Sequence, residues 1–319
     1  MCYSAMVKQK CKTLGLDFEA RVDLNLMEDI FDRRLRGESI IIPKGLEHCF
    51  LNPQSDLEKS IKSKIDSFHE EQIQTLQKEL FTLRKRLVTA EQKLKEKPTK
   101  SAEKEKGVAE RQIERKRLRL ENISRTQYAS TDDRIYPFNW TPVIVERNGE
   151  RVVVPMRYHL RPPGTPPPFD NERPGCYNAR RDNLTKFWRK EFGRKHGIIV
   201  LTSFFENVSR HTYEKRELKA GEKPENLILQ FIPQGVEQMI VPIIWDTWTG
   251  EGESTFDSFA IVTDDPPFEI SDAGHDRCPV FIKHENIASW LNPSGRSDAE
   301  LFAILDDRIR PNYQHEIAA

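Results

Sequence analysis

The chain of 319 residues carries 50 Lys and Arg against 50 Asp and Glu, so its formal net charge is zero and global electrostatics give no argument for nucleic-acid binding. Hydrophobic residues make up 37% and charged residues 31%, which is too apolar for a wholly disordered chain and predicts one large domain or two. No apolar run is long enough for a membrane-spanning helix, and the first residues lack the pattern of a secretory signal, so we expect no membrane partner.

The first 54 residues mix helical and strand signals. Apolar residues from Leu24 to Leu35 recur at helical spacing and stop before Gly37, which predicts a helix. The run Ile40-Ile41-Ile42 before Pro43 predicts a short strand.

From Ser55 to Gln127 the composition becomes strongly charged, with 19 Lys and Arg against 13 Asp and Glu. Apolar residues recur there in steps of three, four and seven, Pro98 interrupts them, and a second apolar series follows. We expect residues 55–127 to form an inserted helical hairpin or coiled coil, and residues 1–54 and 128–319 to form the other domain. Acidic neighbours dilute its basic clusters, so a solvated spacer or dimerising arm is favoured over DNA binding. Replication or repair proteins are the partners that such an arm would bind.

From Tyr136 onward, short apolar runs alternate with Pro and Gly, as in a strand-rich domain. Asn148-Gly149 between two Val-rich runs predicts a two-residue hairpin turn of type I′. Several strands with few helices between them indicate an α+β fold. The expected strands are 143–145, 152–154, 198–201, 227–231, 240–245, 259–262 and 280–282, and the expected helices are 184–192, 287–291 and 298–306.

The five cysteines are scattered and odd in number, which argues against a disulfide framework and for a reducing compartment such as the cytoplasm, on the nucleoid in a bacterium. None has the spacing of a zinc site, and we expect neither a metal nor another cofactor. Cys2 differs from the others because a small residue after Met1 normally permits removal of that Met. Cys2 would then carry a free α-amine and a thiol on neighbouring carbons.

Familiar catalytic signatures are missing from the sequence: GxSxG, Walker A, GxGxxG and HExxH do not occur. Three polar residues embedded in strand-rich sequence remain as candidates, namely Asn178, Glu206 and His275. Taken singly, each also fits a structural role. Asn178 would cap a helix or occupy a turn, Glu206 would lie at an exposed strand edge, and His275 would lie in a loop.

Four motifs occur in order along the chain: Met1-Cys2, Asn178-Ala179-Arg180, Phe204-Phe205-Glu206, and a run from His275 to Val280 with the sequence HDRCPV. As an ordered set they resemble the SOS-response-associated peptidase (SRAP) family, over residues 1–12 and about 136–292. The resemblance implies a core of barrel-like antiparallel sheets with flanking helices, in which the charged hairpin is an insertion. Further matches are 156–160, 245–246, 259–263 and 290–291; the departures include Tyr3 and Ser4, where the family usually has Gly-Arg, and Cys278, where it has Met.

The family shields abasic sites in single-stranded DNA, and the resemblance implies that Cys2 is the reactive residue. An abasic site is partly an open-chain aldehyde, and an α-amine with a pKa of about 8 is nucleophilic near neutral pH. The neighbouring thiol, with a pKa of about 8.5, can then close a thiazolidine ring. In this scheme Glu206 moves protons, His275 assists opening of the sugar or reversal, and Asn178 orients the amine.

The resemblance also implies contacts to DNA. Arg180 and Arg277 would hold phosphates, which position a strand without reading its sequence. Tyr158 would stack on a base, and Thr263 is a further candidate for DNA binding. The same Cys2 thiol would allow self-processing peptidase chemistry, and His275 would assist lyase cleavage.

Two other hypotheses stay open. A cysteine peptidase acting on other proteins would need only the thiol of Cys2, so its activity would survive blocking of the amino terminus. A non-catalytic DNA-binding scaffold would use the hairpin for oligomerisation, and its binding would not depend on Cys2.

Overall fold

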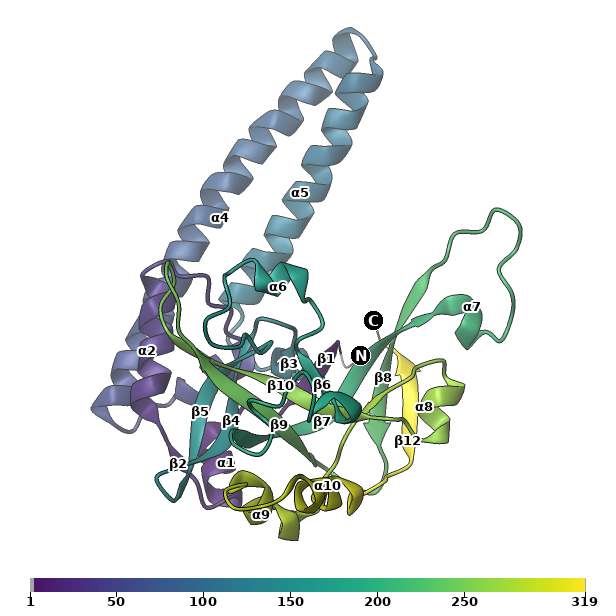
Figure 1. Cartoon of the computed structure of the whole chain (residues 1–319). Helices are drawn as coiled ribbons and strands as arrows, with labels where there is room; N and C mark the ends of the chain where they lie inside the picture. Colours follow the sequence, from purple (N-terminus) through teal and green to yellow (C-terminus); the bar gives the residue numbers. More distant parts are fainter. Residues whose placement is uncertain (1–2, 319) are drawn as a thin grey trace.

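The computed structural model describes residues 3–318, and it is an α+β structure built on one twelve-stranded sheet (Figure 1). The described strands are β1 (Ser4–Val7), β2 (Arg21–Val22), β3 (Arg134–Ile135), β4 (Trp140–Arg147), β5 (Glu150–Tyr158), β6 (Asn178–Arg180), β7 (His196–Ser209), β8 (Asn226–Pro233), β9 (Met239–Trp248), β10 (Phe256–Asp264), β11 (Cys278–Pro279) and β12 (Tyr313–Ile317).

Five of these strands pair in a closed ring: β4 with β5, β5 with β10, β10 with β9, β9 with β7, and β7 with β4. Only the β5–β10 pair is parallel. The ring is rich in β-branched and aromatic residues, which favour the extended conformation, and Val153, Ile243 and Phe259 in it are fully buried. Asn148 and Gly149 both have positive φ between β4 and β5, which confirms the predicted turn.

Strand β7 connects the ring to the rest of the sheet. Its first half, as far as Leu201, pairs with β4 and β9. Its second half leaves the ring and pairs with β1 on one edge and β8 on the other. Side chains near residue 206 therefore lie where the start of the described chain meets the middle of the sheet.

Short helices surround the sheet. They are α1 (Cys11–Asp17), α2 (Leu24–Leu35), α3 (Lys44–Glu47), α6 (Phe169–Glu172), α7 (Arg210–Tyr213), α8 (Phe268–Asp272), α9 (Ile287–Leu291) and α10 (Asp298–Asp306). The predicted helices at 24–35, 287–291 and 298–306 are confirmed as α2, α9 and α10.

Three predicted elements are wrong or too long. Ile41 makes only an isolated bridge to Asn139, so 40–42 is not a strand. Residues 184–192 form turns instead of a helix, because the Trp188 N–H bonds five residues back to Asn183 and the helical register is lost. The run 280–282 divides its hydrogen bonds between Val262 on β10 and Ile240 on β9, so the strand ends with β11.

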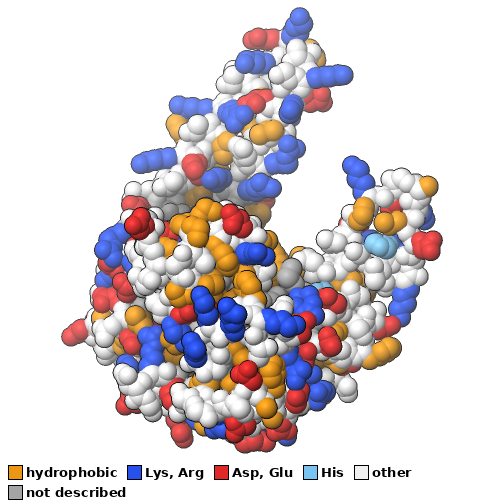
Figure 2. All heavy atoms as spheres, viewed as in Figure 1, with side chains coloured by type: hydrophobic (Ala, Val, Ile, Leu, Met, Phe, Trp, Pro, Cys, Tyr) orange, Lys and Arg blue, Asp and Glu red, His pale blue; other side chains and the backbone are white. Residues whose placement is uncertain are grey.

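Helices α4 (Asp56–Glu96) and α5 (Lys100–Ser124) form the predicted antiparallel hairpin, which projects from the sheet (Figure 1). Ser55 and Thr99 cap their first turns. Lys and Arg side chains are scattered along the hairpin among acidic ones (Figure 2). That residues 55–127 form a domain separate from 1–54 and 128–319 stays a prediction. Among residues 3–318 no helix is both long and apolar enough to cross a membrane.

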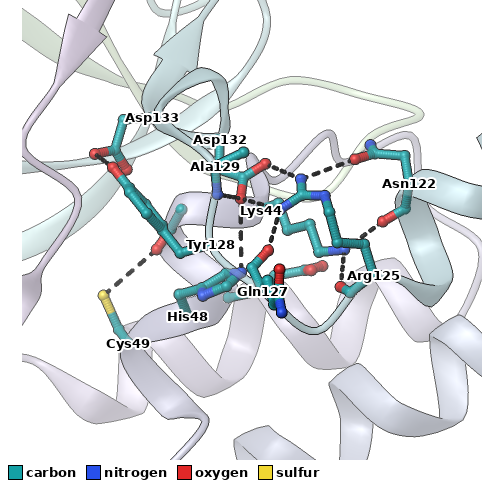
Figure 3. Close-up of polar contacts among 12 residues, drawn as sticks. Lys44, His48, Cys49, Asn122, Arg125, Gln127, Tyr128, Ala129, Asp132 and Asp133 are labelled. Carbon is teal, nitrogen blue, oxygen red and sulfur yellow. Dashed lines mark hydrogen bonds and ion pairs between the residues drawn. The ribbon is translucent and has the colours of Figure 1, made fainter.

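A polar cluster fixes the base of the hairpin to the core (Figure 3). The ammonium group of Lys44 donates hydrogen bonds to the carbonyls of Asn122, Ile123 and Arg125, at the end of α5. Its positive charge also interacts favourably with the negative end of the helix dipole. The Arg125 guanidinium in turn pairs with both carboxylate oxygens of Asp132. The end of α5 is thus tied to α3 and to the turn that precedes β3.

Candidate functional site

The described chain begins beside Glu206. Strand β1 enters the sheet between β3 and β7, with Ser4 opposite Phe205. The backbone N–H of Tyr3 donates a hydrogen bond to the Glu206 carboxyl group. The predicted catalytic Cys2 lies outside the described residues, but Tyr3, to which it is covalently bonded, is in contact with this carboxyl group.

Glu206 and His275 form a buried pair. Glu206 is 1% exposed, and its Oε2 lies 3.1 Å from Nε2 of His275. Burial raises the pKa of Glu206 well above its ordinary value and lowers the pKa of His275 to about 4. Both shifts favour the neutral forms, and so favour a hydrogen bond over an ion pair at this contact.

The tautomer of His275 follows from its second contact. Its Nδ1 lies 3.1 Å from the carbonyl oxygen of Arg277, which can only accept, so Nδ1 carries the proton. In the neutral ring Nε2 is then an acceptor, and the protonated Glu206 carboxyl donates to it. The pair therefore holds one exchangeable proton between Glu206 and His275, which suits general acid–base chemistry.

Three of the predicted DNA-binding residues line one small pocket. Arg180, Thr263 and Arg277 surround a cavity of about 190 Å³ together with Arg181, Asp182, Asp264 and Asp265. Parallel pairing of β6 with β10 sets Arg180 opposite Thr263. The Arg180 guanidinium pairs with Asp182 at 2.8 Å, and its side chain is 39% exposed.

Asn178 lies on β6, two residues before Arg180, so both side chains point to the same face of the strand. Asn178 is buried, and neither polar atom of its amide has a hydrogen-bond partner among the described residues. A buried amide of this kind is costly unless a ligand or water completes it. Asn178 is thus a strand residue, not the helix cap or turn residue of the structural alternative.

Tyr158 is placed differently from the sequence prediction. It is 0% exposed at the end of β5, with its ring stacked on Phe259 at 5.3 Å between centroids and edge-on to Tyr177 at 5.7 Å. The structure leaves no open face on this ring, so the predicted stacking on a base is wrong for this arrangement.

Comparison with known proteins decides the family. The family model described as SOS response associated peptidase (SRAP) matches residues 93–317, which is more than half of the chain. The chain belongs to the SRAP family. The motifs that carried the resemblance at Asn178, Glu206 and His275 all lie inside the matched region.

The similar proteins are distant from this chain in sequence. The chain is 30% identical over 144 residues to the abasic site processing protein YobE of Bacillus subtilis, covering 44% of this chain and 60% of that relative. A solved protein from Bacteroides thetaiotaomicron matches at 19% identity with a TM-score of 0.46, over 58% of this chain and 77% of its own. A phage-related protein from Bordetella bronchiseptica matches at 16% identity and 0.43, over 58% and 80%.

Sequence reasoning missed a cationic and aromatic group beside the chain start. The Arg134 guanidinium lies 3.5 Å from the centre of the Phe205 ring and donates to the hydroxyl oxygen of Ser4. Tyr136 and Tyr3 border it. No spacing rule joins residue 4 to residue 134, and neither β1 nor β3, the two strands that bring them together, was predicted. Among residues 3–318 no cluster of His, Cys, Asp or Glu suited to a metal occurs.

Proposed function

We propose that this SRAP protein captures abasic sites in single-stranded DNA by covalent reaction with Cys2. The observation that carries the proposal is the buried Glu206–His275 pair, which contacts the residue that follows Cys2. The name of the Bacillus subtilis relative, an abasic site processing protein, supports the same substrate.

The chemistry needs both groups of an amino-terminal cysteine. Once Met1 is removed, the α-amine of Cys2 adds to the aldehyde of the ring-opened sugar, and loss of one water gives an imine. The thiol then adds to the imine carbon and closes a five-membered thiazolidine ring. The two nucleophiles are joined through adjacent carbons, so the second step has a high effective molarity.

Glu206 and His275 would supply and remove protons during these steps. The protonated Glu206 carboxyl can protonate the carbinolamine oxygen that leaves as water. As Glu206 takes up a proton from the attacking amine, it passes its own proton to the Nε2 lone pair of His275, 3.1 Å away. The departing water consumes one proton and the amine releases one, so the pair returns to its neutral state at the end of the sequence.

The DNA backbone would bind in the pocket lined by Arg180, Thr263 and Arg277. Nε of Arg277 and the hydroxyl of Thr263 are buried without a hydrogen-bond partner in the described structure, so both can bond to a phosphate or sugar oxygen. The unpaired amide of Asn178, on the same face of β6 as Arg180, would orient the sugar of the lesion.

The test is intact mass after incubation with a single-stranded oligonucleotide that carries one abasic site. Wild type should gain the mass of the oligonucleotide minus one water. Cys2→Ala should gain nothing, while Cys176→Ala, a matched change at a buried thiol, should react like wild type. Each protein is first checked for loss of Met1. Cys2→Ser keeps the amine without the thiol, so its adduct should survive only after reduction with borohydride.

Other outcomes would point elsewhere. If a protein that begins at Cys2 forms no adduct, the proposal fails. If it then cleaves peptides and does so after its amine is blocked, it is a cysteine peptidase. If it binds DNA equally with or without Cys2 and forms no adduct, it is a scaffold. If the purified chain that still carries Met1 loses it, and the Cys2→Ala variant does not, the protein processes itself. If the protein cleaves the DNA strand at the abasic site and the His275→Gln variant does not, the protein has lyase activity.

A further inference from the structure

Four side chains beside the start of the described chain form a group of three aromatic rings around one arginine. We call Tyr3, Arg134, Tyr136 and Phe205 the aromatic platform. Its Tyr3 and Tyr136 rings meet edge to face, with centroids 5.8 Å apart and an angle of 73° between planes. Each of these two tyrosines is 37% exposed, whereas Phe205 is buried.

Arg134 ties the platform together. Its guanidinium lies 3.5 Å from the Phe205 ring centre and 5.0 Å from that of Tyr136. Nε and Nη2 donate to the Ser4 hydroxyl oxygen at 3.1 and 3.0 Å. A guanidinium has five N–H donors, so three remain after these two bonds.

Arg134 is a half-buried cation without an ion-pair partner among residues 3–318. In the described part of the chain no carboxylate lies within ion-pair distance of it, although burial already lowers its pKa. By contrast, the buried guanidinium groups of Arg157 and Arg161 both pair with Asp170. A cation that is withdrawn from water without a partner favours an anion from outside the chain.

We propose that the aromatic platform binds the nucleotide next to the abasic site, with its base on the exposed tyrosine rings and its phosphate on Arg134. This inference rests on the proposed function. The position of the platform supports it, because Tyr3 follows Cys2 directly and its N–H donates a hydrogen bond to Glu206. A sugar attached at Cys2 therefore has its flanking nucleotide within reach of these rings.

The chemistry of the platform matches a nucleotide better than a protein side chain. Exposed aromatic faces stack on any base, and an adjacent guanidinium adds both a cation–π contact and phosphate hydrogen bonds. The two rings are steeply inclined, so a base stacked on one meets the edge of the other. Such binding holds the lesion in place without reading the sequence around it.

The experiment measures non-covalent affinity by fluorescence anisotropy, using single-stranded DNA with a tetrahydrofuran analogue that has no aldehyde. One oligonucleotide has normal bases on both sides of the analogue, and a second has further tetrahydrofuran units there. Tyr136→Ala and Tyr136→Leu should each weaken binding to the first about 5- to 100-fold, the usual range for loss of one base-stacking ring. Both should bind the second as wild type does. Phe81→Ala, which removes an exposed ring on α4, should change neither affinity.

Arg134→Gln tests the phosphate contact. It should reduce the slope of log affinity against log salt by about 0.7, the value for one phosphate of a single strand. Arg36→Gln, at an exposed arginine of comparable charge, should leave the slope unchanged.

Three results would overturn the inference. Equal losses on both oligonucleotides would mean that Tyr136 only supports the fold, and a loss in Tyr136→Ala but not in Tyr136→Leu would mean that bulk and not an aromatic face matters. Unchanged affinity in every variant would remove the platform from the site. These results leave the Cys2 adduct intact, whereas failure of wild type to bind any oligonucleotide or form an adduct would overturn the proposed function as well.

Discussion

The sheet and the hairpin both contain arginine–carboxylate pairs, but these pairs are buried near the sheet and exposed on the hairpin. Near the sheet, Arg157 and Arg161 are buried and converge on Asp170. On the hairpin, pairs such as Arg86 with Glu105 lie in water along the outside of two helices. A buried charge without its partner is very costly, whereas an exposed pair contributes little because water and salt screen it. Counting ion pairs would therefore misjudge which region depends on them.

The hairpin is held together instead by a narrow apolar seam. Leu76, Leu80 and Ala90 of α4 and Ala102 and Ala109 of α5 are buried, and small residues let the helices approach closely. At 1.5 Å per residue the 41 residues of α4 span about 60 Å, so the arm reaches well beyond the core. Its reach comes from helical geometry and its solubility from charge, while the sheet holds the site.

The sharpest test of this contrast removes Asp170. Asp170→Ala leaves the buried guanidinium of Arg157 without its carboxylate and leaves Arg161 with Glu253 alone, so we expect the free energy of unfolding to fall by about 3–5 kcal/mol. Denaturant titration measures this. The matched change Asp66→Ala, at an exposed carboxylate that pairs with Lys62 on α4, should leave the midpoint nearly unchanged. Equal effects would contradict the distinction between the two regions.

Acid should affect the site more than the arm. The pKa of His275 is about 4 in the folded protein and about 6.5 when unfolded, so the unfolded chain binds more protons between these values. Stability is therefore lost as pH falls from 6.5 to 4, by about 3 kcal/mol from this residue. His275→Gln should reduce the loss between pH 7 and pH 4.5, as measured by denaturant titration at both.

Glu206 should act in the opposite direction. Its folded pKa is raised, so the folded state holds a proton that the unfolded chain releases above about pH 4.3. Stability is lost as pH rises above that value, and Glu206→Gln should remove this loss while slowing formation of the adduct. A variant that is both slower and no more stable at pH 8 than wild type would contradict the protonated state assigned to Glu206.

Arg180 gives a smaller effect, on binding alone. Because its side chain is partly exposed and its ion pair within the described structure is with Asp182, Arg180→Ala should leave thermal stability unchanged. It should weaken DNA binding a few-fold to tenfold for every sequence and reduce the salt dependence by about one phosphate contact. Arg189→Ala is the control for a general loss of positive charge. Sequence-dependent weakening would rule out the phosphate role.

The smallest effect is expected on the arm. Glu105→Gln removes the carboxylate that pairs with Arg86, and both groups are fully exposed. Thermal melting at low and high salt should show no measurable change in Tm. A clear loss in this variant would mean that the hairpin depends on its charges after all.

Local signals gave the parts of the fold that depend on few neighbours. The heptad series predicted α4 and α5, and Asn148-Gly149 predicted the turn between β4 and β5, because each of these patterns determines the backbone conformation locally. The helix expected at 184–192 failed for a tertiary reason. Leu184, Trp188 and Phe192 have helical spacing and are all buried, yet the backbone between them bonds in an irregular register.

The sequence predicted which residues form the site, but not their contacts or their protonation states. Glu206 and His275 were identified, yet nothing in the sequence indicated that they touch or that burial makes both neutral. The apolar run before Glu206 was compatible with an exposed strand end, whereas β7 continues to Ser209 and lies between β1 and β8 at this point. Contacts such as Arg134 with Ser4 join strands on either side of the hairpin, and pairing over that separation has no local signature.

Strand β1 has hydrogen-bonded neighbours on both edges, β3 and β7, and so is an interior strand despite lying at the start of the described chain. A pull on that end runs along the strand, so the bonds to both neighbours are loaded in shear and have to break together. If DNA is joined to the protein at Cys2, as proposed, a force that draws on that strand would have to break the bonds of β1 to both β3 and β7.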